Sequence, residues 1–274
     1  MIRQINPFAF VPVYASLNAT HRIMTGNYKK SSVKAEANGL VPIMFWLDGS
    51  QPAATSITVY DASDDSVVTS TSGSLVTATE TTDVNGDVRT VYTFDLGVGS
   101  LSCSFVYVRF VISGISYYTH TMQLQPNGGN TQGERFYLEI SDTRNSVGKK
   151  YYPSGFSERF YFNGYLANQN TEREEDVLIL GDGTRKLLRA DSGYFGTLIV
   201  EDVPEPLFPA LQALSDHDTI TLHRVNPSFS WTLPYPQETS FEVRPRENGY
   251  ANQGVLRWCA ERVQTRNFRN VSVS

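Results

Sequence analysis

The densest group of potential metal ligands in this sequence is Asp216, His217 and Asp218, followed by His223. A metal site formed by such residues needs side chains that converge on one point. His217 and Asp218 are adjacent, so on a strand their side chains would point to opposite faces. A helix end that continues into a strand explains this polar group more simply, and the sequence therefore predicts no metal site here.

Carboxylates gather in two further stretches of the chain. Two carboxyl groups about 5–10 Å apart could hydrolyse a glycosidic bond. The spacing does not bring the two stretches together, and the interleaved Arg173 is typical of a solvated loop. We therefore expect ordinary charged loops around these residues: Glu172, Glu174, Glu175 and Asp176 in one, Glu201, Asp202 and Glu205 in the other.

Three other motifs lack a part that their chemistry requires. The run at 83–87 begins like a calcium loop, but its twelfth position is Phe94, which cannot bind the ion. The run at 97–99 begins like a dinucleotide motif, but Ser102 stands at the third glycine position and no helix follows. Gly155 and Gly193 lack the nucleophile-elbow pattern. The sequence predicts no catalytic, cofactor-binding or metal-binding residue, and we expect no enzyme and no cofactor.

Short apolar-alternating runs dominate the chain and would have to position any functional residue. Asn85-Gly86 and Ser113-Gly114 are typical of hairpin turns. Leu40–Leu47 is nearly all apolar, as in a strand buried on both faces. The expected strands are 40–47, 56–61, 88–96, 105–112, 116–124, 135–140, 159–162, 176–180, 184–188, 194–200, 219–225, 240–243 and 254–258.

The segment 127–133 is rich in glycine and has no large apolar side chain, which favours a linker. The sequence therefore predicts an all-β fold of two β-sandwich-like, immunoglobulin-like domains. The first covers residues 1–126 and has an extended arm at about 1–35; the second covers 134–274. One short helix is expected near 205–214, because Leu207, Leu211 and Leu214 lie on one helical face.

Composition limits the classes of partner. A net charge of −5 argues against non-specific binding to nucleic acid or to anionic membranes. No apolar run is long enough to span a membrane as a helix, and the prolines near the N-terminus do not suit a signal peptide. Cys103 and Cys259 belong to no cysteine motif, so we expect two free thiols; an inter-domain disulfide is the alternative.

An aromatic cluster follows the predicted linker, and three roles fit it: core, subunit contact or a platform for stacking sugars. Core or subunit contact is favoured. The cluster comprises Tyr151, Tyr152, Phe156, Phe160, Tyr161, Phe162 and Tyr165.

Several segments of the chain, in order, resemble a family of tail-associated structural proteins of tailed bacteriophages and prophages of Bacteroidetes-type hosts. The first 35 residues show no such similarity. The similar segments are LVPIMFW, SITVYD, CSFVYVRFVISGISYYTHTMQL, YYPSGFSERFYF, PEPLFPALQALSDHDTITLHR and FEVRPRENGYANQGVLRW.

The resemblance implies a structural role in a virion, in the tail, connector ring or baseplate, after assembly in the host cytoplasm. It implies a homo-oligomer that contacts other virion structural proteins, with no membrane and no specific nucleic acid as partner, and it supplies no catalytic residues. The arm at 1–35 could add a strand to the next subunit. The alternative is a host-glycan-binding or receptor-binding module of a tail fibre. A hydrolase would need a converging carboxylate or Ser/His pair that the sequence does not reveal.

Overall fold

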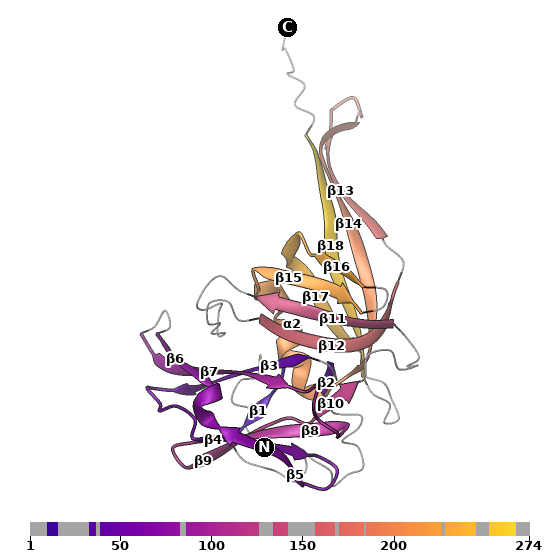
Figure 1. The fold of residues 1–274 in the computed structure, drawn as a ribbon. Coiled ribbons are helices and arrows are strands. Elements are labelled where there is room, and N and C mark those ends of the chain that lie inside the picture. Colours follow the sequence, from indigo (N-terminus) through magenta and orange to yellow (C-terminus); the bar gives the residue numbers. More distant parts are fainter. Residues whose placement is uncertain are drawn as a thin grey trace.

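The computed structural model describes residues 10–15, 33–36, 39–82, 86–125, 134–141, 157–167, 170–183, 185–225, 228–244 and 252–266. Almost all regular structure in these residues is β, as the sequence predicted; the helical segments are the short 3₁₀ helix η2 (Gly73–Leu75) and one short helix in the C-terminal part. Figure 1 shows a lower lobe of N-terminal strands, an upper lobe of C-terminal strands, and a long ribbon that rises from the upper lobe.

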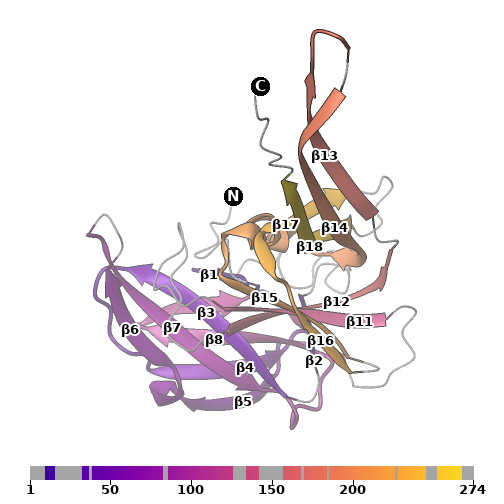
Figure 2. The same cartoon turned by 90° about the horizontal axis from the view of Figure 1, so that it is seen from above.

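Two sheets face each other in the lower lobe (Figure 2). Phe45 in one sheet contacts Phe110 in the other, with ring centroids 5.2 Å apart, and Phe94 meets Phe110 edge to face. The smaller sheet contains β3 (Leu40–Asp48), β7 (Val88–Gly97) and β6 (Thr77–Thr82). The facing strands are β1 (Val13–Tyr14), β9 (Ile115–Thr119), β8 (Phe105–Ile112), β10 (Met122–Gln125), β4 (Ser56–Asp61) and β5 (Val67–Ser72).

Local sequence accounts for these strands and their turns. Val41–Trp46 of β3 is buried at every position, as the continuous apolar run predicted. The β8–β9 hairpin turns at Ser113 and Gly114, whose φ angles of 51° and 77° are those of a type I′ turn. The expected strand at 116–124 is interrupted, because the backbone N–H of His120 donates to Pro12 between β9 and β10.

The upper lobe continues the larger sheet through β2 (Val33–Glu36), which pairs with β10 on one side and β12 on the other. β17 pairs with β18, which pairs with β14, and all three belong to the same larger sheet. The remaining strands are β11 (Glu134–Ser141), β12 (Ser157–Leu166), β13 (Asn170–Ile179), β14 (Arg185–Val203), β15 (Thr219–Arg224), β16 (Phe229–Thr232), β17 (Tyr235–Arg244) and β18 (Asn252–Arg266).

The ribbon consists of β13, β14 and the outer part of β18 (Figure 1). Two predictions are wrong here. Residues 172–176 form part of β13 and 201–202 lie in β14, so neither stretch is a loop. The described part of the predicted strand 184–188 and the predicted strand 194–200 belong to the single strand β14. Charged residues can stay solvated in a strand that has no second sheet packed on it, so their polarity did not require a loop.

The short helix occurs where the leucine spacing predicted it, as η3 (Glu205–Leu207), α2 (Phe208–Gln212) and η4 (Leu214–Asp216). Leu207, Leu211 and Leu214 are fully buried. Such a short helix is not stable alone, so its packing against β17 maintains it.

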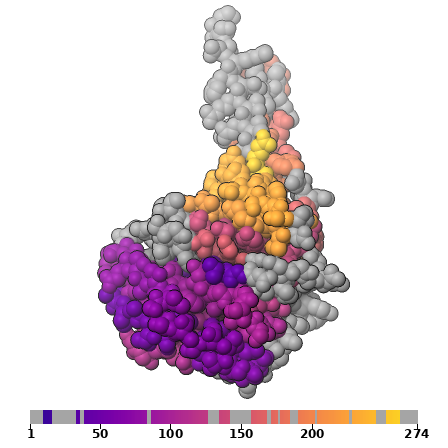
Figure 3. Space-filling view, in the orientation of Figure 1, coloured from indigo at the N-terminus to yellow at the C-terminus, as the bar shows by residue number. Residues whose placement is uncertain are grey.

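The described N-terminal residues pack on their own chain. Phe10 stacks on Phe160 at 5.6 Å, and its backbone N–H donates to the buried carboxylate of Glu158. One continuous cluster of buried side chains includes residues of both lobes, which form neighbouring masses in Figure 3. The predicted linker at 127–133 and part of the predicted arm lie outside the described residues, so the division into two domains stays a prediction.

Candidate functional site

The outward face of the sheet β12–β11–β15–β16 carries two rows of polar and aromatic side chains. Strand alternation produces these rows, because Phe136, Leu138 and Ile140 of β11 point to the core and the residues between them point outward. One row is Arg159, Glu139, Thr221 and Thr232; the other is Tyr161, Tyr137, His223 and Ser230.

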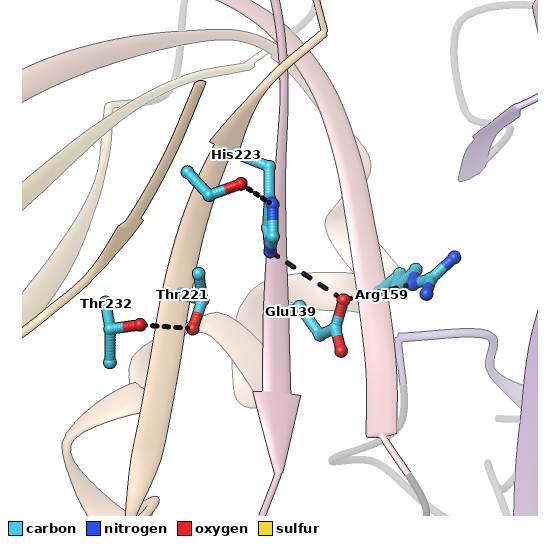
Figure 4. Close-up of polar contacts among 6 residues, drawn as sticks. Glu139, Arg159, Thr221, His223 and Thr232 are labelled. Carbon is cyan, nitrogen blue, oxygen red and sulfur yellow. Dashed lines mark hydrogen bonds and ion pairs between the residues drawn. The ribbon is translucent and has the colours of Figure 1, made fainter. Parts of the chain in front are cut away.

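His223 is the centre of these contacts (Figure 4). Its ring stacks on Tyr137 with centroids 4.2 Å apart, and its Nδ1 lies 2.8 Å from the Ser230 hydroxyl. Its Nε2 lies 3.7 Å from the Glu139 carboxylate, which also pairs with Arg159 at 3.4 Å. One imidazole thus lies between a hydroxyl and a carboxylate on neighbouring strands.

Partial burial lowers the pKa of His223 below its ordinary value of 6.5. The Glu139 carboxylate acts in the opposite direction by favouring the protonated ring, whereas the Arg159 guanidinium adds to the lowering. The ring is therefore neutral at pH 7. In the tautomer that carries its proton on Nε2, Nδ1 accepts a hydrogen bond from the Ser230 hydroxyl.

A serine, a histidine and a glutamate in this order could activate a hydroxyl as a nucleophile. Two features argue against this use. The nitrogen that faces the serine is Nδ1 and not the Nε2 of the well-known triad, and 3.7 Å is longer than a hydrogen bond. A hydrolase also needs a cavity for its substrate, and the cavity described next is lined by residues of the other face of this sheet.

That cavity has a volume of about 300 Å³. It opens where the inward-facing row of β15 and β16 reaches the edge of the core, and β14 and β18 form its other wall. Its lining is Phe136, Leu166, Ala167, Gly196, Thr197, Leu222, Arg224, Phe229, Trp231 and Trp258.

The polar group at 216–218 lies at the end of the short helix and in its connection to β15. His217 is buried just after η4 and precedes β15, in the helix-to-strand connection that the sequence predicted. Across the described ranges, no three His, Cys, Asp or Glu side chains are placed to hold a metal ion.

The two carboxylate stretches also stay apart. Glu172 is opposite Gly193 on β14, whereas Glu201 lies further along the same strand. At about 3.3 Å per residue, Gly193 and Glu201 are roughly 26 Å apart, too far for glycosidase chemistry. Glu172 instead pairs with Arg257, and Arg173 with Glu175 at 2.6 Å.

The aromatic cluster divides between core and surface. Phe160, Tyr161 and Phe162 are buried, and Tyr165 is 49% exposed. Tyr151, Tyr152 and Phe156 lie outside the described residues.

Cys103 and Cys259 are both free thiols, as expected. Burial, followed by the nearby Asp61 carboxylate, raises the pKa of the Cys103 thiol, and Cys259 is fully buried. A raised pKa disfavours the reactive thiolate form of Cys103.

Sequence reasoning missed both the His223 contacts and the cavity. Cross-strand register produces the first, and a sequence does not show which strands are neighbours. The cavity had a local signal, because Ile220, Leu222 and Arg224 alternate onto one face and place a charge at the end of an apolar row.

None of the helices in the described ranges is long and apolar enough to cross a membrane. Comparison with protein-family models, with curated proteins and with solved structures found no match.

Proposed function

We propose that this chain is a structural component of a tailed-phage virion, in the tail, connector ring or baseplate, that acts by self-association and by contact with other virion proteins. The observation that carries the proposal is the β13–β14 ribbon. It extends away from both lobes (Figures 1 and 2), and its outer end bears apolar side chains that the chain itself leaves uncovered.

The exposed apolar residues are consecutive. Val177, Leu178 and Ile179 are 42%, 44% and 63% exposed at the end of β13. Among the described strands β13 pairs only with β14, so its other edge is open. Proteins protect open edges with charge, and Glu172–Glu175 provides charge along the inner part of β13, but 177–179 carries none.

A second copy of this chain is the partner that a virion ring would supply. Consecutive apolar side chains on an open edge favour a neighbouring strand or an apolar groove as their contact. Contact with a partner would remove these apolar side chains from water, which favours association.

Sedimentation of the purified chain tests the proposal. The native protein should form oligomers, and the triple variant Val177→Thr, Leu178→Thr, Ile179→Thr should sediment as a monomer with an unchanged circular dichroism spectrum. The matched control is Leu75→Thr, which changes an exposed leucine on the lower lobe, 60% exposed, and should leave the oligomer intact. A native chain that stays monomeric and joins no particle would overturn the proposal.

A second candidate is a host-glycan-binding or receptor-binding module of a tail fibre. The cavity with Trp231, Trp258 and Phe229 in its lining favours it, since aromatic walls with a few polar groups are typical of small-molecule sites.

The finer description of the fold belongs to the proposal as well. Facing sheets joined by Phe45, Phe94 and Phe110 support a β-sandwich of immunoglobulin-like type for the N-terminal part.

A further inference from the structure

The cavity between β15–β16 and β14–β18 is formed by the end of an apolar row. On the inward face, Leu222 pairs with Trp231, and the next inward positions are Arg224 and Phe229. Leu222 is 3% exposed, whereas Phe229 is 54% exposed. The apolar interior therefore reaches the surface here, with an aromatic ring and a guanidinium at its edge.

The opposite wall depends on a glycine. Gly196 of β14 is the cross-strand partner of Trp258 of β18, and the indole lies directly over it. A Cβ at position 196 would come within 2.3 Å of Trp258 Cζ2 and 2.9 Å of Nε1. Only glycine allows the Trp258 ring to occupy this position in the lining of the cavity, where it packs with the Trp231 ring in a T-shaped arrangement with centroids 5.4 Å apart.

Two hydrogen-bond donors in this lining are unsatisfied. The Trp258 side chain is 1% exposed, and its Nε1–H has no acceptor within the part of the chain that the structure describes. The Nε–H of Arg224 is also buried without an acceptor there, although the other end of the guanidinium pairs with Glu134. Buried donors normally have partners, and a ligand in this cavity would supply the missing acceptors. Arg109 Nε–H, outside this lining, is also buried without an acceptor among the described residues, so the Trp258 N–H is the more specific of the two indications.

The required ligand has an apolar face for the aromatic rings and acceptor oxygens at its edge for the two N–H groups. A pyranose ring has both, because its C–H groups form a face that suits the negative face of an aromatic ring, and its hydroxyl oxygens surround that face. A purely apolar side chain would leave both donors unsatisfied. The volume of about 300 Å³ is at the lower end of small-ligand sites and is sufficient for one sugar unit.

We propose that this cavity binds one pyranose unit of a carbohydrate, stacked on Phe229 and Trp231 and hydrogen-bonded by Trp258 Nε1 and Arg224 Nε. This proposal rests on the second candidate function, glycan binding, and does not depend on self-association through the ribbon.

The test measures binding of a panel of methyl pyranosides (glucose, galactose, mannose, rhamnose and N-acetylglucosamine) to the full chain. Saturation-transfer NMR and tryptophan fluorescence provide the readouts. At least one glycoside should bind, and Phe229→Ala should weaken it by about tenfold or more because the exposed stacking face is lost. Trp258→Phe keeps an aromatic ring, removes the donor and should weaken binding as well.

Tyr165→Ala is the matched control, because it removes a similarly exposed ring from the opposite face of β12, and binding should be unchanged. Phe229→Ala by itself carries the test if Trp258→Phe does not fold.

Binding of a glycoside that neither variant weakens would overturn this site while leaving glycan binding itself intact. Absence of binding by every glycoside would overturn both. Suppose that the apolar dye anilinonaphthalene sulfonate binds the cavity but no glycoside binds it or displaces the dye. This result would also overturn the proposal, and would identify the cavity as a contact for an apolar protein segment.

Discussion

The lower lobe and the β13–β14 ribbon are both made of antiparallel strands, but only the lobe buries a face. In β8, Val106, Val108, Phe110 and Ile112 are almost completely buried against a second sheet. In the described side chains of β13, every residue from 171 to 179 is exposed. Backbone pairing is therefore sufficient to form the strand β13. Side chains are buried only where a second sheet faces the strand, as it faces β8.

The ribbon also shows why such a strand can persist. β14 is hydrogen-bonded to β13 at residues 185–195 and to β18 from residue 189 onward, so that 189–195 has a partner strand on both sides. The guanidinium of Arg257 lies 4.2 Å from the centre of the Phe195 ring and pairs with Glu172, which joins the three strands at the base of the ribbon. Beyond this base the apolar residues 177–179 are exposed, and for this reason we propose them as the contact with a partner.

The largest effect is expected inside the lobe. Phe110→Ala should lower the free energy of unfolding by about 3–5 kcal/mol, because it removes a fully buried ring that contacts Phe45 and Phe94. Urea denaturation followed by circular dichroism measures this loss. A loss below about 1 kcal/mol would contradict the view that the two sheets stabilise each other.

Leu211→Ala should cost about 2–5 kcal/mol, since Leu211 is fully buried in the short helix. The same denaturation experiment applies, with the exposed neighbour Gln212→Ala as a control that should change little. If Leu211→Ala kept full stability but prevented incorporation into particles, the leucine face would be an assembly surface and not core.

The partial burial of His223 should make the stability of the protein depend on pH. Because the native pKa of His223 is lowered, the unfolded chain binds more protons than the native one as the pH falls below about 6.5. The native state should therefore lose stability as the pH falls from above 6.5 to below the native pKa, with no further loss from this residue at lower pH.

His223→Gln should reduce this slope, which thermal denaturation at a series of pH values would measure. His217→Gln is a comparison that changes a histidine elsewhere in the same lobe. An unchanged slope in His223→Gln would show that His223 titrates normally in the folded protein.

The smallest effect is expected on the ribbon. Ile179→Thr should change the unfolding free energy by no more than about 0.5 kcal/mol, because the side chain is 63% exposed. Measurement should use protein dilute enough to be monomeric, since a partner that binds the native state would raise the apparent stability. A loss of several kcal/mol would mean that the ribbon stabilises the monomer itself, which would remove the contrast with the lobe.

The sequence by itself determined the strands that bury a face and the turns between them. Alternation placed the strands 56–61 and 105–112 at their observed bounds. Ser113-Gly114 indicated a hairpin turn, because such a turn requires positive φ angles at its two central residues. Leucine spacing located the short helix. Strands without an apolar face gave no such signal: β5 and β6 are rich in Ser and Thr, and the inner part of β13 is charged, so alternation failed to identify them.

Tertiary structure alone decided which residues meet. His223, Ser230 and Glu139 come together because β15 pairs with β11 on one side and with β16 on the other, and no local pattern encodes the order of strands. The cavity likewise requires that Trp258 lie over Gly196, which depends on the register between β14 and β18. Residue types determine what each side chain can do, but long-range pairing determines its neighbours, and the candidate site on this chain depends on those neighbours.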